Sequence, residues 1–206
     1  MSDTPKDILD RVYAMKGSDE AERVYDEWAE RYDDDTVAGL GYVGPAVAAA
    51  KLVELARPEV VLDAGCGTGL VGMELAKRIE VTLDGVDLSP GMLDQARARG
   101  IYRNLTRADL TQRLDIADDT YDAAICVGTL TEGHVGPEAL DELARVVRSG
   151  GHVVAPVLDR VWESGGYRAH VDALAASGAV VLREADAHPY LEAEGSGCRL
   201  CVLDVR

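Results

Sequence analysis

The sequence predicts an α/β fold with a Rossmann-like, doubly wound sheet of seven mostly parallel strands. Three observations favour this class. Apolar strand-like runs alternate with helical runs after Pro58, a glycine-rich turn follows the first of these runs, and the last two runs have no helical segment between them. We expect a single domain, 1–206, in which a helical N-terminal lid, 1–56, covers a Rossmann-like core, 57–206.

The N-terminal region is predicted to be helical. Ser18 can cap a helix over 19–32, in which Tyr25, Trp28 and Tyr32 share one face. Pro45 favours the first turn of another helix.

The core is predicted to alternate between strands and helices. Strands are expected at 60–63, 81–87, 102–108, 121–127 and 152–157, and helices at 70–78, 90–99 and 137–147. This alternation places helices on both faces of a parallel sheet.

The C-terminal strands break the alternation. After a helix at 167–177, strands are expected at 179–185 and 198–205, and the intervening 192–197 has the composition of a loop. A parallel pair needs a crossover of roughly a dozen residues or more, usually a helix. These two strands are therefore predicted to form an antiparallel hairpin at the end of the sheet.

The composition is that of a globular protein with a strong negative charge. Of the 206 residues, 47% are hydrophobic and 28% are charged, and the formal net charge is −16. Nucleic-acid binding needs a basic surface, so the charge argues against a nucleic-acid partner. Solubility or salt tolerance explains an acid-rich surface, and selection of a cationic substrate stays open as the alternative.

The apolar runs and the cysteines indicate in which cellular compartment the protein is expected. No apolar run approaches the roughly 18 residues that span a bilayer, and the first residues lack the basic and apolar regions of a signal peptide. Cys198 and Cys201 form a C-x-x-C, but in a strand an offset of three points the two side chains to opposite faces. We therefore expect no membrane association, no metal, and free thiols in a cytoplasmic location.

Three acidic residues near the ends of successive strands predict a nucleotide-like ligand. Asp63 precedes the turn Gly65-Cys66-Gly67, whose backbone N–H groups can form a cradle. Asp87 ends the second strand and can accept hydrogen bonds from both hydroxyls of a ribose. Asp109 follows the third strand and can accept from the amine of adenine. Three further residues are expected around the base: Leu88, Met92 and Leu110.

The same turn admits two classes of cofactor. The segment from Gly67 to Gly72 satisfies G-x-G-x-x-G, and Asp87 lies about 20 residues past Gly67, as in dinucleotide-binding proteins. Asp63, however, would face a pyrophosphate, whereas a cationic cofactor such as S-adenosylmethionine tolerates that charge. Together with Asp109 and the C-terminal hairpin, Asp63 favours S-adenosylmethionine over NAD. Each acid alone could also be a cap at a strand-to-helix turn.

With these motifs, the chain resembles the class I S-adenosylmethionine-dependent methyltransferases. VVLDAGCGTG is similar to the first motif of the family, GVDLSPGML to its second-strand acid and following helix, and RADL to its adenine contact. YDAAICVG and LARVVRSGGHVV resemble its fourth strand and the helix, turn and strand after it. YDEWAERYDDD, LGYVGPAVAA and VGTLTEGHV are also similar to the Williams–Beuren-region methyltransferase-like subfamily.

The resemblance implies further contacts with S-adenosylmethionine. Asp63 would hold the amino end of the cofactor, directly or through water. Tyr25 and Tyr32 would form a lid over it, although packing against the sheet explains that aromatic face equally well. Backbone groups would contact the methionine part at Gly65, Cys66, Gly67, Cys126 and Val127.

The predicted reaction is transfer of a methyl group to a small-molecule acceptor by in-line displacement. Glu132 and His134 are the predicted catalytic residues, His134 as a general base. The nearby segment 128–131 reads GTLT and lacks the Asn/Asp-Pro-Pro-Tyr sequence of base and glutamine methylases, which disfavours DNA and RNA. Candidates for the acceptor pocket are Tyr42, His188 and Tyr190. A non-catalytic S-adenosylmethionine-binding regulatory protein is the alternative function.

Overall fold

A seven-stranded sheet forms the centre of the molecule in a computed structural model, which describes residues 4–133 and 135–206. The strand order is β3-β2-β1-β4-β5-β7-β6. Strands β1 to β5 are parallel, and β7 runs antiparallel to both β5 and β6. Both the predicted fold class and the C-terminal hairpin are confirmed. The strands are β1 Val60–Ala64, β2 Thr82–Asp87, β3 Tyr102–Arg107, β4 Tyr121–Ile125, β5 Val147–Leu158, β6 Val180–Leu191 and β7 Ser196–Val205.

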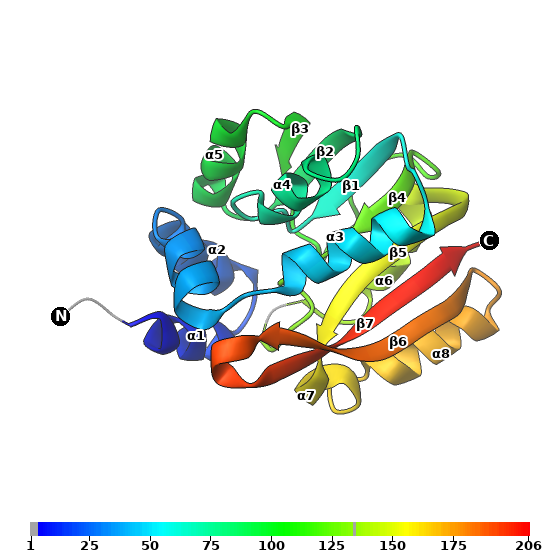
Figure 1. Ribbon diagram of the computed structural model, residues 1–206. Coiled ribbons are helices and arrows are strands. Elements are labelled where there is room, and N and C mark those ends of the chain that lie inside the picture. Colours follow the sequence, from blue (N-terminus) through cyan, green and yellow to red (C-terminus); the bar gives the residue numbers. More distant parts are fainter. Residues whose placement is uncertain (1–3, 134) are drawn as a thin grey trace.

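Helices cover both faces of this sheet (Figure 1). Helix α3 crosses in front of the strands in this view, and α6 and α8 lie behind them. Right-handed crossovers explain why the helices are divided between the two faces of the sheet. The chain builds outward from β1 to β3 and then returns to β4, so the later helices lie on the opposite face. The carboxyl ends of β1 and β4 therefore open a crevice where the strand order reverses. The helices of the core are α3 Gly44–Leu55, α4 Leu70–Ala76, α5 Pro90–Arg99, α6 Ala139–Val146, α7 Asp159–Trp162 and α8 Tyr167–Ala176.

The N-terminal elements are α1 Pro5–Ala14, α2 Ser18–Trp28 and the π-helical segment Asp34–Gly39. Helix α2 is shorter than predicted and Ser18 does not cap it, because Gly17 occupies the N-cap position with a φ of 86°. After the helix ends at Trp28, the indole Nε1 donates to Asp35 at 2.8 Å. This bond fixes the turn that follows α2.

The main hydrophobic core lies between the sheet and its helices. Leu52 of α3, Leu62 of β1 and Leu143 of α6 are all fully buried. Burial of each such side chain contributes roughly 1.5–3 kcal/mol. The four cysteines are free and buried, as predicted for Cys198 and Cys201 in β7. In the described part of the chain, no helix is long and apolar enough to cross a bilayer.

Candidate active site

The glycine-rich turn between β1 and α4 packs tightly against its neighbours. The backbone N–H groups of Gly65 and Cys66 donate to the carbonyl of Val86, at 2.8 and 3.0 Å. Gly65 has a φ of 71°, and a Cβ there would collide with the hydroxyl of Thr129. Glycine is therefore required both by the backbone conformation and by the close approach of the loop after β4.

Asp87 stands at the carboxyl end of β2 and closes the same turn. Its carboxylate accepts from the backbone N–H of Gly67 at 2.8 Å and from that of Ser89 at 2.9 Å. Burial raises the pKa of Asp87, and these two N–H groups oppose the rise. The carboxylate also lines the cavity above the turn, where it can accept hydrogen bonds from a ligand.

Helix α5 begins directly after Asp87 and positions the apolar wall. The Ser89 hydroxyl accepts from the Met92 N–H at 3.0 Å, an N-cap that starts the helix. Leu88 and Met92 then line the cavity. Across from them, Asp109 accepts from the N–H and hydroxyl of Thr111, at 2.9 and 2.7 Å, so it also caps its own turn.

Helix α2 closes the cavity from the N-terminal side. Tyr25 and Tyr32 both line it, and burial raises the pKa of each phenol, so both hydroxyls are neutral at pH 7. Trp28 lies between them, 6.4 Å from Tyr25 and 4.8 Å from Tyr32 between ring centroids. The aromatic rings therefore pack on one another and two of them also line the cavity, while their role as a lid over the cofactor stays a prediction.

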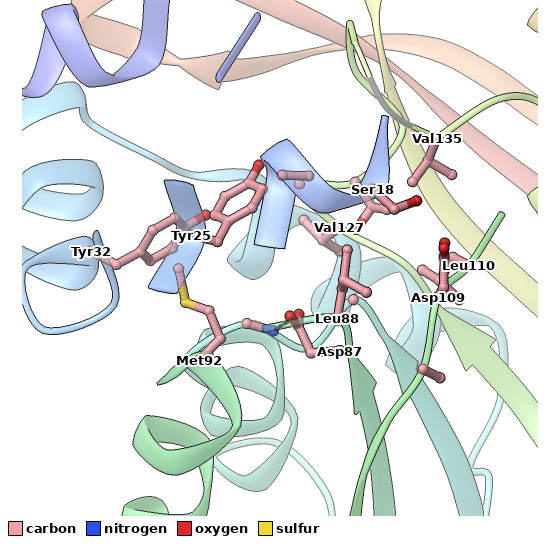
Figure 2. A pocket seen from close by; sticks show the side chains of 16 residues that line it. Ser18, Tyr25, Tyr32, Asp87, Leu88, Met92, Asp109, Leu110, Val127 and Val135 are labelled. Atoms are coloured by element: carbon pink, nitrogen blue, oxygen red, sulfur yellow. Dashed lines mark hydrogen bonds between the residues drawn. The ribbon is translucent and has the colours of Figure 1, made fainter. Parts of the chain in front are cut away.

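The cavity is partly open to solvent, and the empty space within it, open part included, is about 630 Å³. Figure 2 shows Tyr25, Tyr32 and Met92 on one side of it, Asp109 and Leu110 on the other, and Asp87 with Leu88 between them. The ends of β1, β2 and β4 and the lid helix thus surround one site.

Comparisons with known proteins agree with this arrangement. The family described as "Methyltransferase domain" matches residues 61–151. Human methyltransferase-like protein 27 is 42% identical over 155 residues, which are 71% of this chain and 62% of that protein. Residues 61–151 thus match a methyltransferase domain, and the chain is similar to the class I S-adenosylmethionine-dependent methyltransferases.

Other relatives match shorter stretches. The ubiquinone biosynthesis O-methyltransferase of Alkalilimnicola ehrlichii is 34% identical over 48% of this chain and 42% of its own length. The 18S rRNA (guanine-N(7))-methyltransferase of Bos taurus is 36% identical over 36% of this chain and 26% of its own length. In all three curated relatives, the matched part is less than two thirds of the protein.

A solved structure shares the fold. It is the methyltransferase in complex with the Trm112 methyltransferase activator of Haloferax volcanii, with a TM-score of 0.66 and 19% identity. The match covers 88% of this chain and 97% of that one.

Most of the residues predicted to contact the cofactor line the cavity. Ten of the predicted residues line it: Tyr25, Tyr32, Gly65, Gly67, Asp87, Leu88, Met92, Asp109, Leu110 and Val127. The turn does not form an open N–H cradle, however. The N–H groups of Gly65, Cys66 and Gly67 all donate within the protein, so this turn offers a ligand its Cα and carbonyl surface.

Asp63 lies behind the turn. Its side chain is fully buried and is absent from the described cavity lining, so the expected contact with the amino end of the cofactor, directly or through water, stays a prediction. The Tyr102 hydroxyl donates to Oδ2 at 2.6 Å, while Oδ1 has no hydrogen-bond partner among the described residues. Burial raises the pKa of Asp63 to about 7. A buried acceptor this close to the turn suits a cationic cofactor.

Two cysteines, Cys66 and Cys126, were predicted to contact the cofactor through their backbone, and their side chains lie behind the site. Cys66 packs with Leu93 and Ala96 beneath the turn, and Cys126 is fully buried in the main core. Neither side chain lines the cavity described above. Burial raises the pKa of the Cys126 thiol to about 12, so it stays protonated and does not act as a nucleophile at neutral pH.

Of the predicted catalytic pair, the structure describes only Glu132. Glu132 forms an ion pair with Arg160, at 3.3 Å, and is absent from the cavity lining. His134 lies outside the described residues.

Two of the three residues predicted for the acceptor pocket face one another in a cavity, and the third pairs with a glutamate instead. Tyr42 and Tyr190 face one another in a second cavity, whereas His188 pairs with Glu184 at 3.6 Å along β6.

Several residues that line the cavity were not predicted to do so from the sequence: Ser18, Ala21, Ala108, Gly128, Thr129 and Val135. Ser18 was predicted to cap a helix. It lines the cavity because it is the first residue of α2. From the sequence, Thr129 was a candidate for the general base after the fourth strand, not a residue of the cofactor cavity. Its position against Gly65 depends on the β1–β4 pairing, which strand spacing alone does not give.

Proposed function

We propose that this protein transfers the methyl group of S-adenosylmethionine to a small-molecule acceptor. The observation that carries the proposal is the cavity bounded by Asp87, Asp109 and the lid tyrosines. When bound there, S-adenosylmethionine supplies an electrophilic methyl group and leaves as S-adenosylhomocysteine.

The residues of the chain would bind, orient and exclude water. Asp87 would accept from the ribose hydroxyls, with its own position fixed by Gly67 and Ser89. Leu88 and Met92 would pack on the base. Tyr25 and Tyr32 would keep water from the reacting centre, which favours displacement by positioning.

Two features support a small-molecule acceptor over a nucleic acid. The chain carries a net charge of −16, and no Lys or Arg is among the described residues that line the cavity. Phosphate backbones are bound through such cations. The names of the relatives include both a ubiquinone-pathway and an rRNA methyltransferase, so RNA is the competing acceptor to test.

The test supplies methyl-labelled S-adenosylmethionine together with either a metabolite extract or purified rRNA. We expect S-adenosylhomocysteine release with the extract and label in a small product. Label in rRNA alone would overturn the small-molecule acceptor. Tight cofactor binding without release in either pool would instead support the non-catalytic regulatory protein.

A further inference from the structure

A second cavity adjoins the cofactor cavity and is lined largely by aromatic side chains. Its empty space, open part included, is about 380 Å³, and it shares Tyr25, Tyr32 and Gly128 with its neighbour. Of the eight tyrosines and two tryptophans in the chain, five tyrosines and one tryptophan line it: Tyr13, Tyr25, Trp28, Tyr32, Tyr42 and Tyr190. We call this cavity the tyrosine chamber.

The tyrosine chamber carries no charged side chain among the described residues that line it. Burial raises the pKa of Tyr25, Tyr42 and Tyr190 well above the usual value, so their hydroxyls are neutral at pH 7. An anion entering the chamber would lose its hydration without gaining an opposite charge, whereas the faces of the aromatic rings can attract a cation. The lining therefore disfavours an anionic occupant.

Three tyrosine hydroxyls converge where the two cavities meet. Gly128 follows β4 with a φ of 86°, and a Cβ built on it would lie 2.9 Å from the Tyr42 hydroxyl. The same position is 3.8 Å from the Tyr32 hydroxyl and 3.9 Å from that of Tyr190. The absence of a side chain at Gly128 leaves this junction open to the hydroxyls.

The backbone holds the Tyr42 and Tyr190 rings in place. Their hydroxyl oxygens are 3.2 Å apart and the rings meet edge to face, with centroids separated by 5.2 Å. The Val43 N–H donates to the Tyr190 carbonyl at 3.1 Å. A Cβ on Gly44 would come within 2.8 Å of both rings. The pair is therefore fixed before any ligand arrives.

We propose that the tyrosine chamber binds the methyl acceptor, and that this acceptor is a planar aromatic molecule that carries a hydroxyl or amino group and no negative charge. The aromatic walls would pack on its ring. The hydroxyls of Tyr42 and Tyr190 would bond its polar group and direct it past Gly128 toward the cofactor cavity. This inference rests on the methyltransferase function proposed above.

The transfer balances without a further reactant. A lone pair on the acceptor oxygen or nitrogen forms the new bond to the methyl carbon while the carbon–sulfur bond breaks. The sulfur keeps that electron pair and becomes a neutral thioether, and the proton on the acceptor atom passes to water. Tyr42 and Tyr190 are positioning residues in this scheme, because their neutral hydroxyls do not remove the proton.

The experiment is calorimetry with matched probes on the full chain. S-adenosylhomocysteine is titrated first, and 2-naphthol, 6-hydroxy-2-naphthoate and a naphthyl-trimethylammonium salt are then titrated into the complex. We expect saturable binding of 2-naphthol, at least tenfold weaker binding of the anionic naphthoate, and tighter binding of the cationic salt than of the naphthoate. Tyr42→Phe and Tyr190→Phe should each weaken 2-naphthol binding about 3- to 10-fold, as expected for one lost hydrogen bond.

The control is Tyr121→Phe, which removes a buried hydroxyl that is bonded to Asp84 and is not part of the described chamber lining. It should leave 2-naphthol binding unchanged, and all three variants should bind S-adenosylhomocysteine as the wild type does. Equal or tighter binding of the anionic naphthoate would overturn the proposal, as would no 2-naphthol binding in a complex that holds S-adenosylhomocysteine. Failure to bind S-adenosylhomocysteine itself would overturn the methyltransferase function.

Discussion

Asp63 and Asp87 show how two acids in similar sequence positions take different roles. Both end strands next to the glycine turn, yet Asp87 lines the cavity and Asp63 is buried behind it. The sequence placed both acids correctly at the crevice edge. It could not give the direction of the Asp63 side chain, because that depends on Tyr102 approaching from β3.

Asp87→Asn is expected to weaken S-adenosylhomocysteine binding about 10- to 100-fold, the effect of losing a charged hydrogen-bond acceptor. Calorimetry measures this directly. Asp84→Asn is the matched control on the same strand, since Asp84 pairs with Arg103 outside the described cavity lining. An unchanged affinity in Asp87→Asn would remove this carboxylate from the cofactor site.

Asp63 should make stability depend on pH. Its pKa is raised to about 7 in the fold, against roughly 3.9 when unfolded, so the folded state holds the proton more tightly. The stabilising contribution is complete below about pH 4 and is lost as pH rises toward 7, by at most about 1.4 kcal/mol per pH unit.

Asp63→Asn tests this, because an amide does not titrate. Urea unfolding between pH 4.5 and 7.5 should show the wild type losing stability relative to the variant as pH rises. A difference between the two proteins that stays constant over that range would contradict the buried, protonated carboxyl.

At the scale of elements, acidic residues fasten the lid helix to the core. Asp26 accepts from the Gly91 N–H at 2.8 Å, at the start of α5. Glu22 pairs with Arg107 at 2.6 Å, at the end of β3. Beyond the helix, Asp33 contacts both the Thr68 hydroxyl, at 2.5 Å, and the guanidinium of Arg99. These contacts were not predicted, because they join segments far apart in the sequence.

Asp33→Ala should release the lid at the glycine turn. We expect S-adenosylhomocysteine to dissociate several-fold faster, since Thr68 and Arg99 lose their partner while the cavity lining is unchanged. Stopped-flow fluorescence measures the rate. Asp34→Ala removes a neighbouring, exposed acid and serves as the control. Equal dissociation rates in the two variants would show that Asp33 does not hold the lid.

At the scale of the whole molecule, the sequence predicted the fold class better than the site. Strand and helix patterns from Val60 onward follow local periodicity, and the missing helix before β7 correctly indicated the hairpin. The insertion of β7 between β5 and β6 follows from pairing at long range and has no local signal. The tyrosine chamber has the same origin, since Tyr42 and Tyr190 meet only after the sheet is complete.

The central claim is that the cavity above Asp87 holds S-adenosylmethionine, and the most direct measurement is calorimetry with S-adenosylhomocysteine and NAD on the wild-type protein. The account predicts one saturable site for S-adenosylhomocysteine, weakened by Asp87→Asn, and no measurable heat with NAD. Saturable binding of NAD with none for S-adenosylhomocysteine would contradict it.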